Sequence, residues 1–139
     1  MKLKISIAKW NDKNFILNHD EYVAKKTMLE KIKRKEYIIA KVNNKSVGFL
    51  RFGYFWSKIP IIEMIRIEEN MRKQGIGRKM VKLLKKIAKK QKNKFILSSS
   101  TGNEKEPQNW HKKIGFKEIG KINTNYPSKI PEVFFLKEI

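Results

Sequence analysis

The chain has 139 residues, a length typical of one domain around one hydrophobic core. It has no cysteine and only two histidines, which excludes disulfides, thiol nucleophiles and thiolate metal sites and argues against a dedicated zinc site. The formal charge of +20 favours an anionic ligand, although an excess of Lys, Ile and Asn also follows from an AT-rich genome.

The N-terminal residues show no targeting signal. Residues 3–7 alternate between apolar and polar side chains, which predicts a strand rather than the apolar core of a signal peptide. No run of about 20 apolar residues follows anywhere in the chain. We therefore expect a soluble, cytoplasmic protein without a membrane partner.

Two helical segments are predicted after the first strand. Residue types that favour N-caps stand at positions 11–12, before a helical pattern over residues 15–23 with a break near Asn18. Apolar residues at helical spacing over 28–32 predict the second segment.

A β-hairpin and a further strand are predicted next. Residues 37–42 and 46–56 have strand character, and the polar sequence Asn-Asn-Lys at 43–45 is typical of a tight turn between them. An apolar strand over 61–67 follows, and the polar residues 68–70 end it.

The clearest predicted element is a long amphipathic helix that begins at Ile76. Its apolar side chains recur at helical spacing as far as Ala88, and Lys and Arg fill the other face. A short buried strand over 95–97 and a short helix over 108–114 follow, and Gly115 ends that helix. The last two predicted strands are 116–122 and 132–136.

The loop between the apolar strand and the long helix is suited to binding a phosphate group. Gly75 and Gly77 allow the backbone to approach a ligand closely. The helix that begins there directs free N–H groups and the positive end of its dipole to the same place. A plain strand-to-helix turn that needs glycine is the alternative.

The order of these motifs resembles the GNAT superfamily of acyl-CoA N-acyltransferases. Arg72-x-x-Gly75-x-Gly77 matches the cofactor signature of that family, and Gly115-Phe116, within residues 114–120, resembles its second signature. The resemblance spans nearly the whole chain. It implies a single N-acetyltransferase domain over residues 1–139, of the α/β (α+β) class. The fold would be a twisted, mixed, largely antiparallel sheet with helices on both faces.

The resemblance also implies where acetyl-CoA binds, with no metal. The cofactor would lie between two neighbouring strands that splay apart, residues 61–67 and 95–98, with its pantetheine arm bonded to main chain like an added strand. The pyrophosphate would lie on the N–H groups of residues 74–79, Arg72 would position the loop, and lysine and arginine side chains would reach phosphate oxygens or remain solvated. The expected cofactor-binding residues are Ile65, Ile67, Arg72, Lys73, Gln74, Gly75, Ile76, Gly77, Arg78, Lys79 and Asn103.

Glu63 is the preferred general base. It is a lone carboxylate in an apolar strand, and regular alternation places it on the face of Ile65 and Ile67, toward the expected thioester. A bulge in the strand would break this argument. The alternative is an ion pair with Arg51, Arg66 or a lysine.

His111 stands where the family often has a tyrosine that protonates the CoA sulfur, four residues before Gly115. An imidazole can donate a proton, because its usual pKa is about 6.5. The alternative is a structural hydrogen bond within the helix. Tyr126, in the loop between the last two strands, is a second candidate for this role.

The sequence therefore predicts an N-acetyltransferase that moves the acetyl group of acetyl-CoA to a primary amine by direct attack on the thioester. The acceptor is left open between a small molecule and a protein amine, and a homodimer is also left open. A catalytically inactive acyl-CoA sensor is the alternative, since the usual tyrosine is missing. A basic nucleic-acid-binding protein is a third reading, but no nucleic-acid-binding motif occurs and we expect no such partner.

Overall fold

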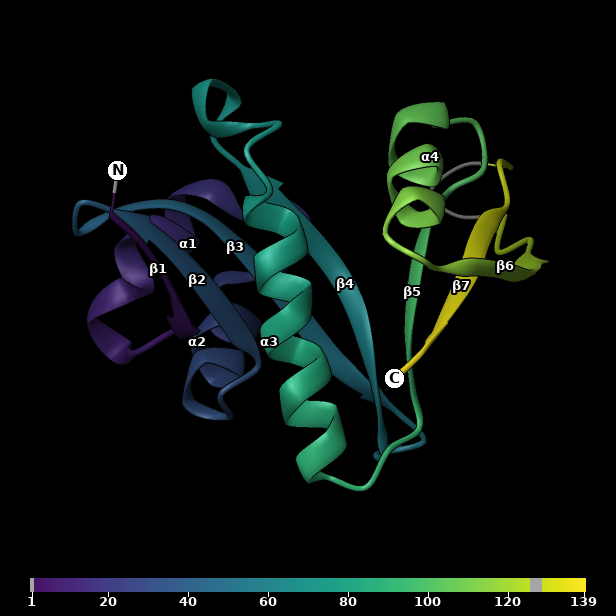
Figure 1. Ribbon diagram of the computed structural model, residues 1–139, viewed down its shortest axis with the longest axis horizontal. Helices are drawn as coiled ribbons and strands as arrows, with labels where there is room; N and C mark the ends of the chain where they lie inside the picture. The colour runs from purple at the N-terminus through teal and green to yellow at the C-terminus, as the bar shows by residue number, and fades with distance from the viewer. Residues whose placement is uncertain (1, 126–128) are drawn as a thin grey trace.

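A single mixed sheet organises the molecule, and helices cover both of its faces (Figure 1). The computed structural model describes residues 2–125 and 129–139. The seven strands lie in the order β1-β2-β3-β4-β5-β7-β6, and neighbouring strands are antiparallel except for the parallel pair β4 and β5. The expected α/β class and largely antiparallel sheet are confirmed. No helix among the described residues is long and apolar enough to cross a membrane.

The first four strands form an antiparallel meander. The expected hairpin is confirmed, because Asn43 and Asn44 have φ angles of 50° and 68° and so supply the left-handed geometry that a tight hairpin turn requires. These strands are β1 (Leu3–Ile7), β2 (Tyr37–Val42), β3 (Lys45–Phe55) and β4 (Ile59–Ile67).

Two short helices, α1 (Lys13–His19) and α2 (Lys25–Lys33), cover one face of this meander. They follow a 3-10 turn, Trp10–Asp12, in which the Asp12 carboxylate accepts a hydrogen bond of 2.8 Å from the Lys9 N–H. The helical pattern expected over 15–23 ends earlier, at His19. The core beneath these helices consists of Ala8, Ile16, Met28, Ile32, Tyr37, Ile39 and Phe49.

The long helix α3 (Ile76–Lys90) covers the opposite face and begins at the predicted residue. Met80, Leu84 and Ala88 lie on its buried stripe with no exposed surface. They pack with Leu50 and other residues that alternate with the first core along the strands. The predicted amphipathic helix is therefore confirmed.

The C-terminal part adds three strands and one helix. Helix α4 begins at Lys105 rather than at residue 108, because Pro107 is tolerated in the first turn of a helix. It ends as predicted at Gly115, whose φ is 98°, with the N–H of Phe116 bonded to the His111 carbonyl. The elements are β5 (Phe95–Thr101), α4 (Lys105–Lys113), β6 (Lys117–Ile122) and β7 (Glu132–Glu138).

The parallel strands β4 and β5 are joined over a very short length. Their paired positions are Ile61 with Leu97 and Ile62 with Ser98. Beyond these positions the two strands diverge, and Figure 1 shows them opening toward the end of the molecule that carries the start of α3 and helix α4. We call the Ile62–Ser98 position the vertex of the gap.

Candidate functional site

The glycine loop presents free backbone donors at the open end of the gap. Gly75 is the N-cap of α3 with a φ of 78°, and apart from its chain neighbours no described residue has an atom within 4 Å of the position where its Cβ would stand. Among the described residues, no group accepts the N–H groups of Ile76, Gly77 and Arg78, the first turn of α3. The Lys79 N–H instead donates to the Gly75 carbonyl at 3.1 Å. The expected row of free N–H groups therefore ends at residue 78.

Arg72 is turned back onto the preceding strand. Its Nε donates a hydrogen bond of 3.0 Å to the Ile67 carbonyl, and the side chain lies at an exposed position. This contact ties the glycine loop to the end of β4. The role of Arg72 in positioning the loop for the cofactor stays a prediction.

Gly77 lies at a narrow junction between three elements. A Cβ at this position would stand 3.1 Å from Cζ2 of Trp110 in α4 and 3.4 Å from Cδ1 of Ile67 in β4. Gly77 thus lets the start of α3 pack closely against both sides of the gap. Ile65 and Ile67 are half-buried on this α3 face, and Asn103 lies exposed in the turn before α4.

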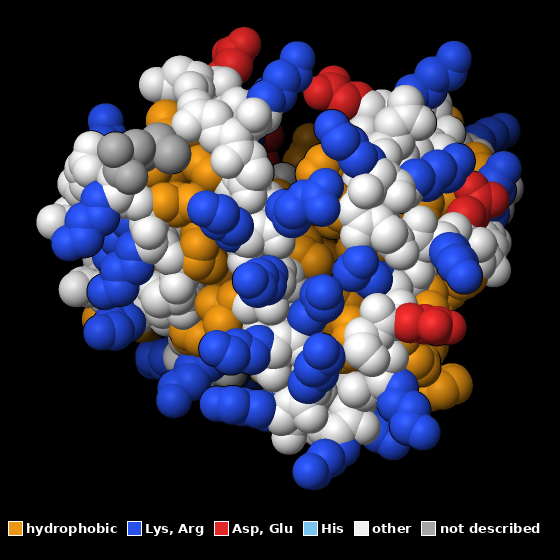
Figure 2. All heavy atoms as spheres, in the orientation of Figure 1, with side chains coloured by type: hydrophobic (Ala, Val, Ile, Leu, Met, Phe, Trp, Pro, Cys, Tyr) orange, Lys and Arg blue, Asp and Glu red, His pale blue; other side chains and the backbone are white. Residues whose placement is uncertain are grey.

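Positive charge surrounds this region of the surface. Figure 2 shows Lys and Arg side chains over the face that carries α3, and a hollow between the start of α3 and the part that carries α4. Beside the gap, Ser100 of β5 has a buried hydroxyl with no hydrogen-bond partner among the described residues. Free N–H groups, cations and an unpaired hydroxyl together fit a phosphorylated ligand with a polar arm.

Strand β4 contains a β-bulge at Glu63, and this corrects the expected direction of the carboxylate. Arg51 of β3 lies opposite Met64 and Phe52 lies opposite Ile62, so Glu63 is the additional residue. Ile65 packs into the core under α3, whereas Met64 packs into the core under α1 and α2. Glu63 contacts residues on the α1–α2 side, so the expectation that it shares a face with Ile65 and Ile67 is wrong.

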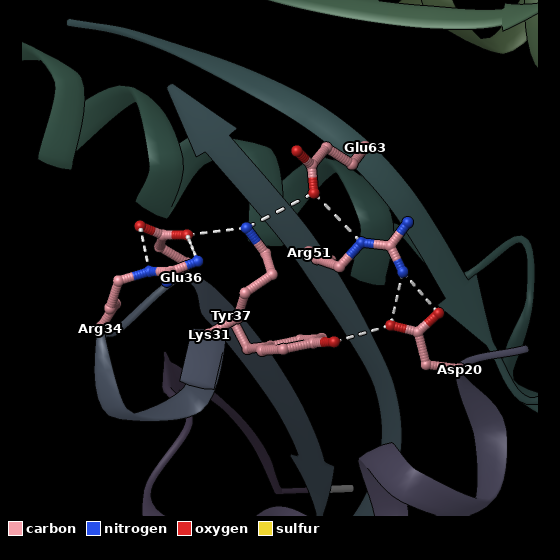
Figure 3. A network of polar contacts seen from close by, with 7 residues as sticks. All are labelled: Asp20, Lys31, Arg34, Glu36, Tyr37, Arg51 and Glu63. Atoms are coloured by element: carbon pink, nitrogen blue, oxygen red, sulfur yellow. Dashed lines mark hydrogen bonds and ion pairs between the residues drawn. The ribbon is translucent and has the colours of Figure 1, made fainter. Parts of the chain in front are cut away.

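Glu63 belongs to a chain of charged side chains shown in Figure 3. Its Oε1 lies 3.2 Å from Arg51 Nε and 3.5 Å from Lys31 Nζ. The alternative interpretation of Glu63 as an ion-pair partner is therefore seen in the structure. Its side chain keeps 38% of its surface exposed, so the carboxylate is also open to solvent and to a ligand.

The buried carboxylate of Asp20 holds Arg51 at the other end of this network of charged side chains. Both oxygens of Asp20 lie 2.6 Å from Arg51 Nη1, and the Tyr37 hydroxyl donates to Asp20 at 2.7 Å. Burial and the adjacent Asp20 raise the pKa of Tyr37, so its hydroxyl remains protonated. Burial alone would lower the pKa of Arg51, but Asp20, Tyr37 and Glu63 together outweigh burial and the pKa is raised. Arg51 is thus a permanent cation beside Glu63.

His111 is buried, and both of its ring nitrogens are hydrogen-bonded. Nδ1 lies 2.7 Å from the Pro107 carbonyl, which can only accept, so Nδ1 carries the proton. Nε2 lies 2.6 Å from Ser98 Oγ and therefore accepts the hydroxyl proton. The ring stacks on Phe135 with centroids 4.5 Å apart, and burial lowers its pKa. His111 is neutral and makes the structural hydrogen bond that the sequence left as the alternative role.

The two candidate catalytic residues lie near the vertex, on opposite faces of the sheet. Ser98, which holds His111, pairs with Ile62, the residue before Glu63. Ile62 belongs to the core under α3, while Glu63 points to α2.

Sequence reasoning missed Ser98, Asp20, Lys31 and Tyr37, because their contacts join distant parts of the chain. The candidate Tyr126 lies outside the described residues. Among the residues that are described, no cluster of His, Asp and Glu could hold a metal.

The sequence matches the family described as Acetyltransferase (GNAT) family over residues 5–116. This match covers more than half of the chain, and the chain therefore belongs to the GNAT family of acetyltransferases. No curated protein matches the sequence.

Solved structures share the whole fold. Ard1 from Thermoplasma volcanium superposes with a TM-score of 0.85 at 14% identity, over 100% of this chain and 99% of that one. A protein assigned as a streptothricin acetyltransferase from Bacillus anthracis str. Ames, in complex with acetyl coenzyme A, gives 0.81 at 18% identity, over 100% and 99%. The ribosomal-protein-S18-alanine N-acetyltransferase from Escherichia coli gives 0.82 at 16% identity, over 99% and 94%. At these identities the likeness establishes the fold.

Proposed function

We propose that the protein transfers an acetyl group from acetyl-CoA to a primary amine. One observation carries the proposal: the gap between β4 and β5 opens beside the free N–H groups of α3, in a chain of the GNAT family. We assign the pyrophosphate to the first turn of α3 and the pantetheine arm to the unpaired edge of β4 near Ile65 and Ile67. Acetyl-CoA supplies the acyl group as a thioester.

We assign the amine-binding and general-base role to Glu63. An alkyl amine has a pKa near that of lysine, about 10.4, so it arrives protonated and must lose a proton before it attacks. The Glu63 carboxylate is near the vertex and partly exposed, which supports this role. It lies on the α1–α2 side, so we assign the acceptor to that side and the cofactor to the α3 side.

We assign His111 a positioning role instead of direct proton donation. Its Nε2 fixes the Ser98 hydroxyl at the vertex, and its only N–H is already donated to the Pro107 carbonyl. A ring that holds Ser98 in this way keeps a polar group at the vertex, on the face opposite Glu63.

The proposed acceptor carries few positive charges. The surface is strongly basic, and two cations flank Glu63, so a polycation would be repelled. A pocket of about 180 Å³ near the end of β4 is lined by His19 and Glu68, whose Nε2 and Oε1 atoms lie 3.5 Å apart, and it offers a polar surface to the acceptor. The names of the similar structures suggest two acceptor classes for trial, a small amino compound and the α-amine of a protein.

The test is to incubate the protein with acetyl-CoA and each of a panel of amines. Turnover is measured as the rate at which the free thiol of CoA appears. The protein has no cysteine, so a thiol reagent reports CoA alone. We expect Glu63→Gln to lower turnover about 10²–10⁴-fold with acetyl-CoA affinity retained, because a neutral amide cannot accept the proton. Glu118→Gln, on the exposed strand β6, is the matched control.

Two results would contradict the proposal. Tight acetyl-CoA binding without acylation of any amine would favour the inactive sensor. Wild-type turnover in the Glu63→Gln variant would remove Glu63 from the chemistry while leaving the family assignment unchanged.

A further inference from the structure

We infer that Gly53 is a positioning residue for the reaction, because its missing side chain leaves the space that Glu63 Oε2 occupies. The inference rests on the proposed role of Glu63. It concerns a residue on the neighbouring strand β3, opposite Ile61 in the ladder.

The oxygen Oε1 is held by two cations from different elements. Arg51 approaches it from β3 and Lys31 from α2, at 3.2 Å and 3.5 Å. Both cations are themselves fixed: Arg51 is bonded to Asp20, and Lys31 Nζ lies 2.7 Å from Glu36 Oε1. Arg34 lies beyond Glu36, at 3.4 Å from its other oxygen. The position of Oε1 is therefore fixed by its two contacts.

The oxygen Oε2 has no hydrogen-bond donor among the described residues. Figure 3 shows it turned away from both Arg51 and Lys31. A carboxylate with one oxygen fixed and the other unpaired presents a single acceptor in a defined direction. In the proposed reaction, this oxygen is the one that meets the acceptor amine.

Gly53 is what allows Oε2 to occupy this place. A Cβ on Gly53 would stand 2.6 Å from Glu63 Oε2, closer than such atoms can pack, and 3.3 Å from Glu63 Cδ, a tight contact. The same Cβ would stand 3.5 Å from Lys31 Nζ, an ordinary contact. An alanine here would therefore displace the carboxylate before any other group.

The displacement costs little stability but changes the direction of Oε2. The clashing atoms are the end of a flexible side chain, which rotates away without moving the backbone of β4. The backbone of Gly53 is not left-handed, so alanine introduces no backbone strain. Gly53→Ala should therefore give a folded protein in which the general base is misplaced. A small misplacement of a catalytic group has a large effect on rate.

The experiment is a double-mutant cycle on turnover. We would measure kcat/KM for the best amine in the wild type, Gly53→Ala, Glu63→Gln and the double variant. We expect Gly53→Ala to lower kcat/KM at least about tenfold in the wild-type background and less than about twofold in the Glu63→Gln background, since coupled residues are not additive. Acetyl-CoA affinity and the melting temperature should remain near wild type. Gly120→Ala is the matched control, because beyond its chain neighbours none of the residues that the structure describes comes within 4 Å of its Cβ position.

Each other outcome overturns the inference. Wild-type kcat/KM in Gly53→Ala would show that the free space is irrelevant, and equal losses in both backgrounds would show that Gly53 acts independently of Glu63. Wild-type turnover in Glu63→Gln alone would instead overturn the proposed base itself. The cycle therefore separates a failure of this inference from a failure of the proposed function.

Discussion

His111 is a titratable side chain that is only 5% exposed, enclosed by aromatic rings. Burial disfavours the imidazolium and lowers its pKa, although the Pro107 carbonyl acts in the opposite direction. The neutral ring is what allows Nε2 to accept the Ser98 proton. Protonation in acid would make Nε2 a donor to the Ser98 oxygen, so the Ser98 hydroxyl proton would lose its acceptor and a charge would be placed in the core.

This arrangement predicts acid sensitivity of the fold. The unfolded chain binds the proton at about pH 6.5, above the folded pKa, so the free energy of unfolding should fall as the pH drops below that value. The slope contributed by this one group is at most about 1.4 kcal/mol per pH unit. Urea unfolding between pH 7.5 and 5.5 measures it, and His111→Gln should remove this component. The same pH dependence in His111→Gln and the control His19→Gln would contradict the prediction.

The network of charged side chains from Asp20 to Glu63 shows the limit of sequence reasoning at the residue scale. The sequence offers Arg51 as one of several partners for Glu63, but Asp20 and Lys31 come from other segments, and nothing in their local pattern marks them. Tyr37 lies in a strand that sequence alone predicts well, yet its bond to Asp20 depends on how α1 ends. Such contacts follow from packing and require a structure.

At the scale of elements, the loop before α3 depends on one left-handed residue. Gly75→Val would force a β-branched side chain into a φ of 78°, which costs about 1–2 kcal/mol. We expect a loss of unfolding free energy of this size and weaker acetyl-CoA binding, because the N–H groups of Ile76 to Arg78 would be displaced.

Gly75→Asn is the matched variant for this prediction, since asparagine tolerates the left-handed region. Calorimetry with acetyl-CoA should rank the affinities as wild type, then Asn, then Val. Equal affinity in all three would show that this loop does not bind the cofactor.

Helix α3 and strand β4 differ in how well the sequence predicts which face of each element is buried. The apolar stripe of α3 repeats over fifteen residues, so its start and its buried face follow from the sequence. The bulge at Glu63 arises from pairing with Arg51 and Phe52 of β3, and one additional residue reverses the side of the strand on which the carboxylate lies. Local alternation cannot detect it, and the predicted face was wrong for that reason.

At the scale of the whole molecule, the two parts of the sheet are joined at two residue pairs. We expect acetyl-CoA to slow amide exchange at residues 63–67, where the edge of β4 toward β5 is unpaired, and at residues 76–78, the first turn of α3. Exchange in the outer strands β1 and β6 should be unchanged, because these strands lie farthest from the gap. Exchange followed by mass spectrometry with and without acetyl-CoA tests this, and equal protection throughout the chain would contradict it.

The same two-pair junction has a consequence for synthesis on the ribosome. Strands β1 to β4 each pair with their neighbour in sequence, so their ladder can be complete once residue 67 has emerged. The opposite side of the gap needs β5, and β5 in turn pairs with β7, which is synthesised after α4 and β6. The gap is therefore completed later than the ladder from β1 to β4, and until β5 pairs with β4 that strand is an open edge of the nascent sheet.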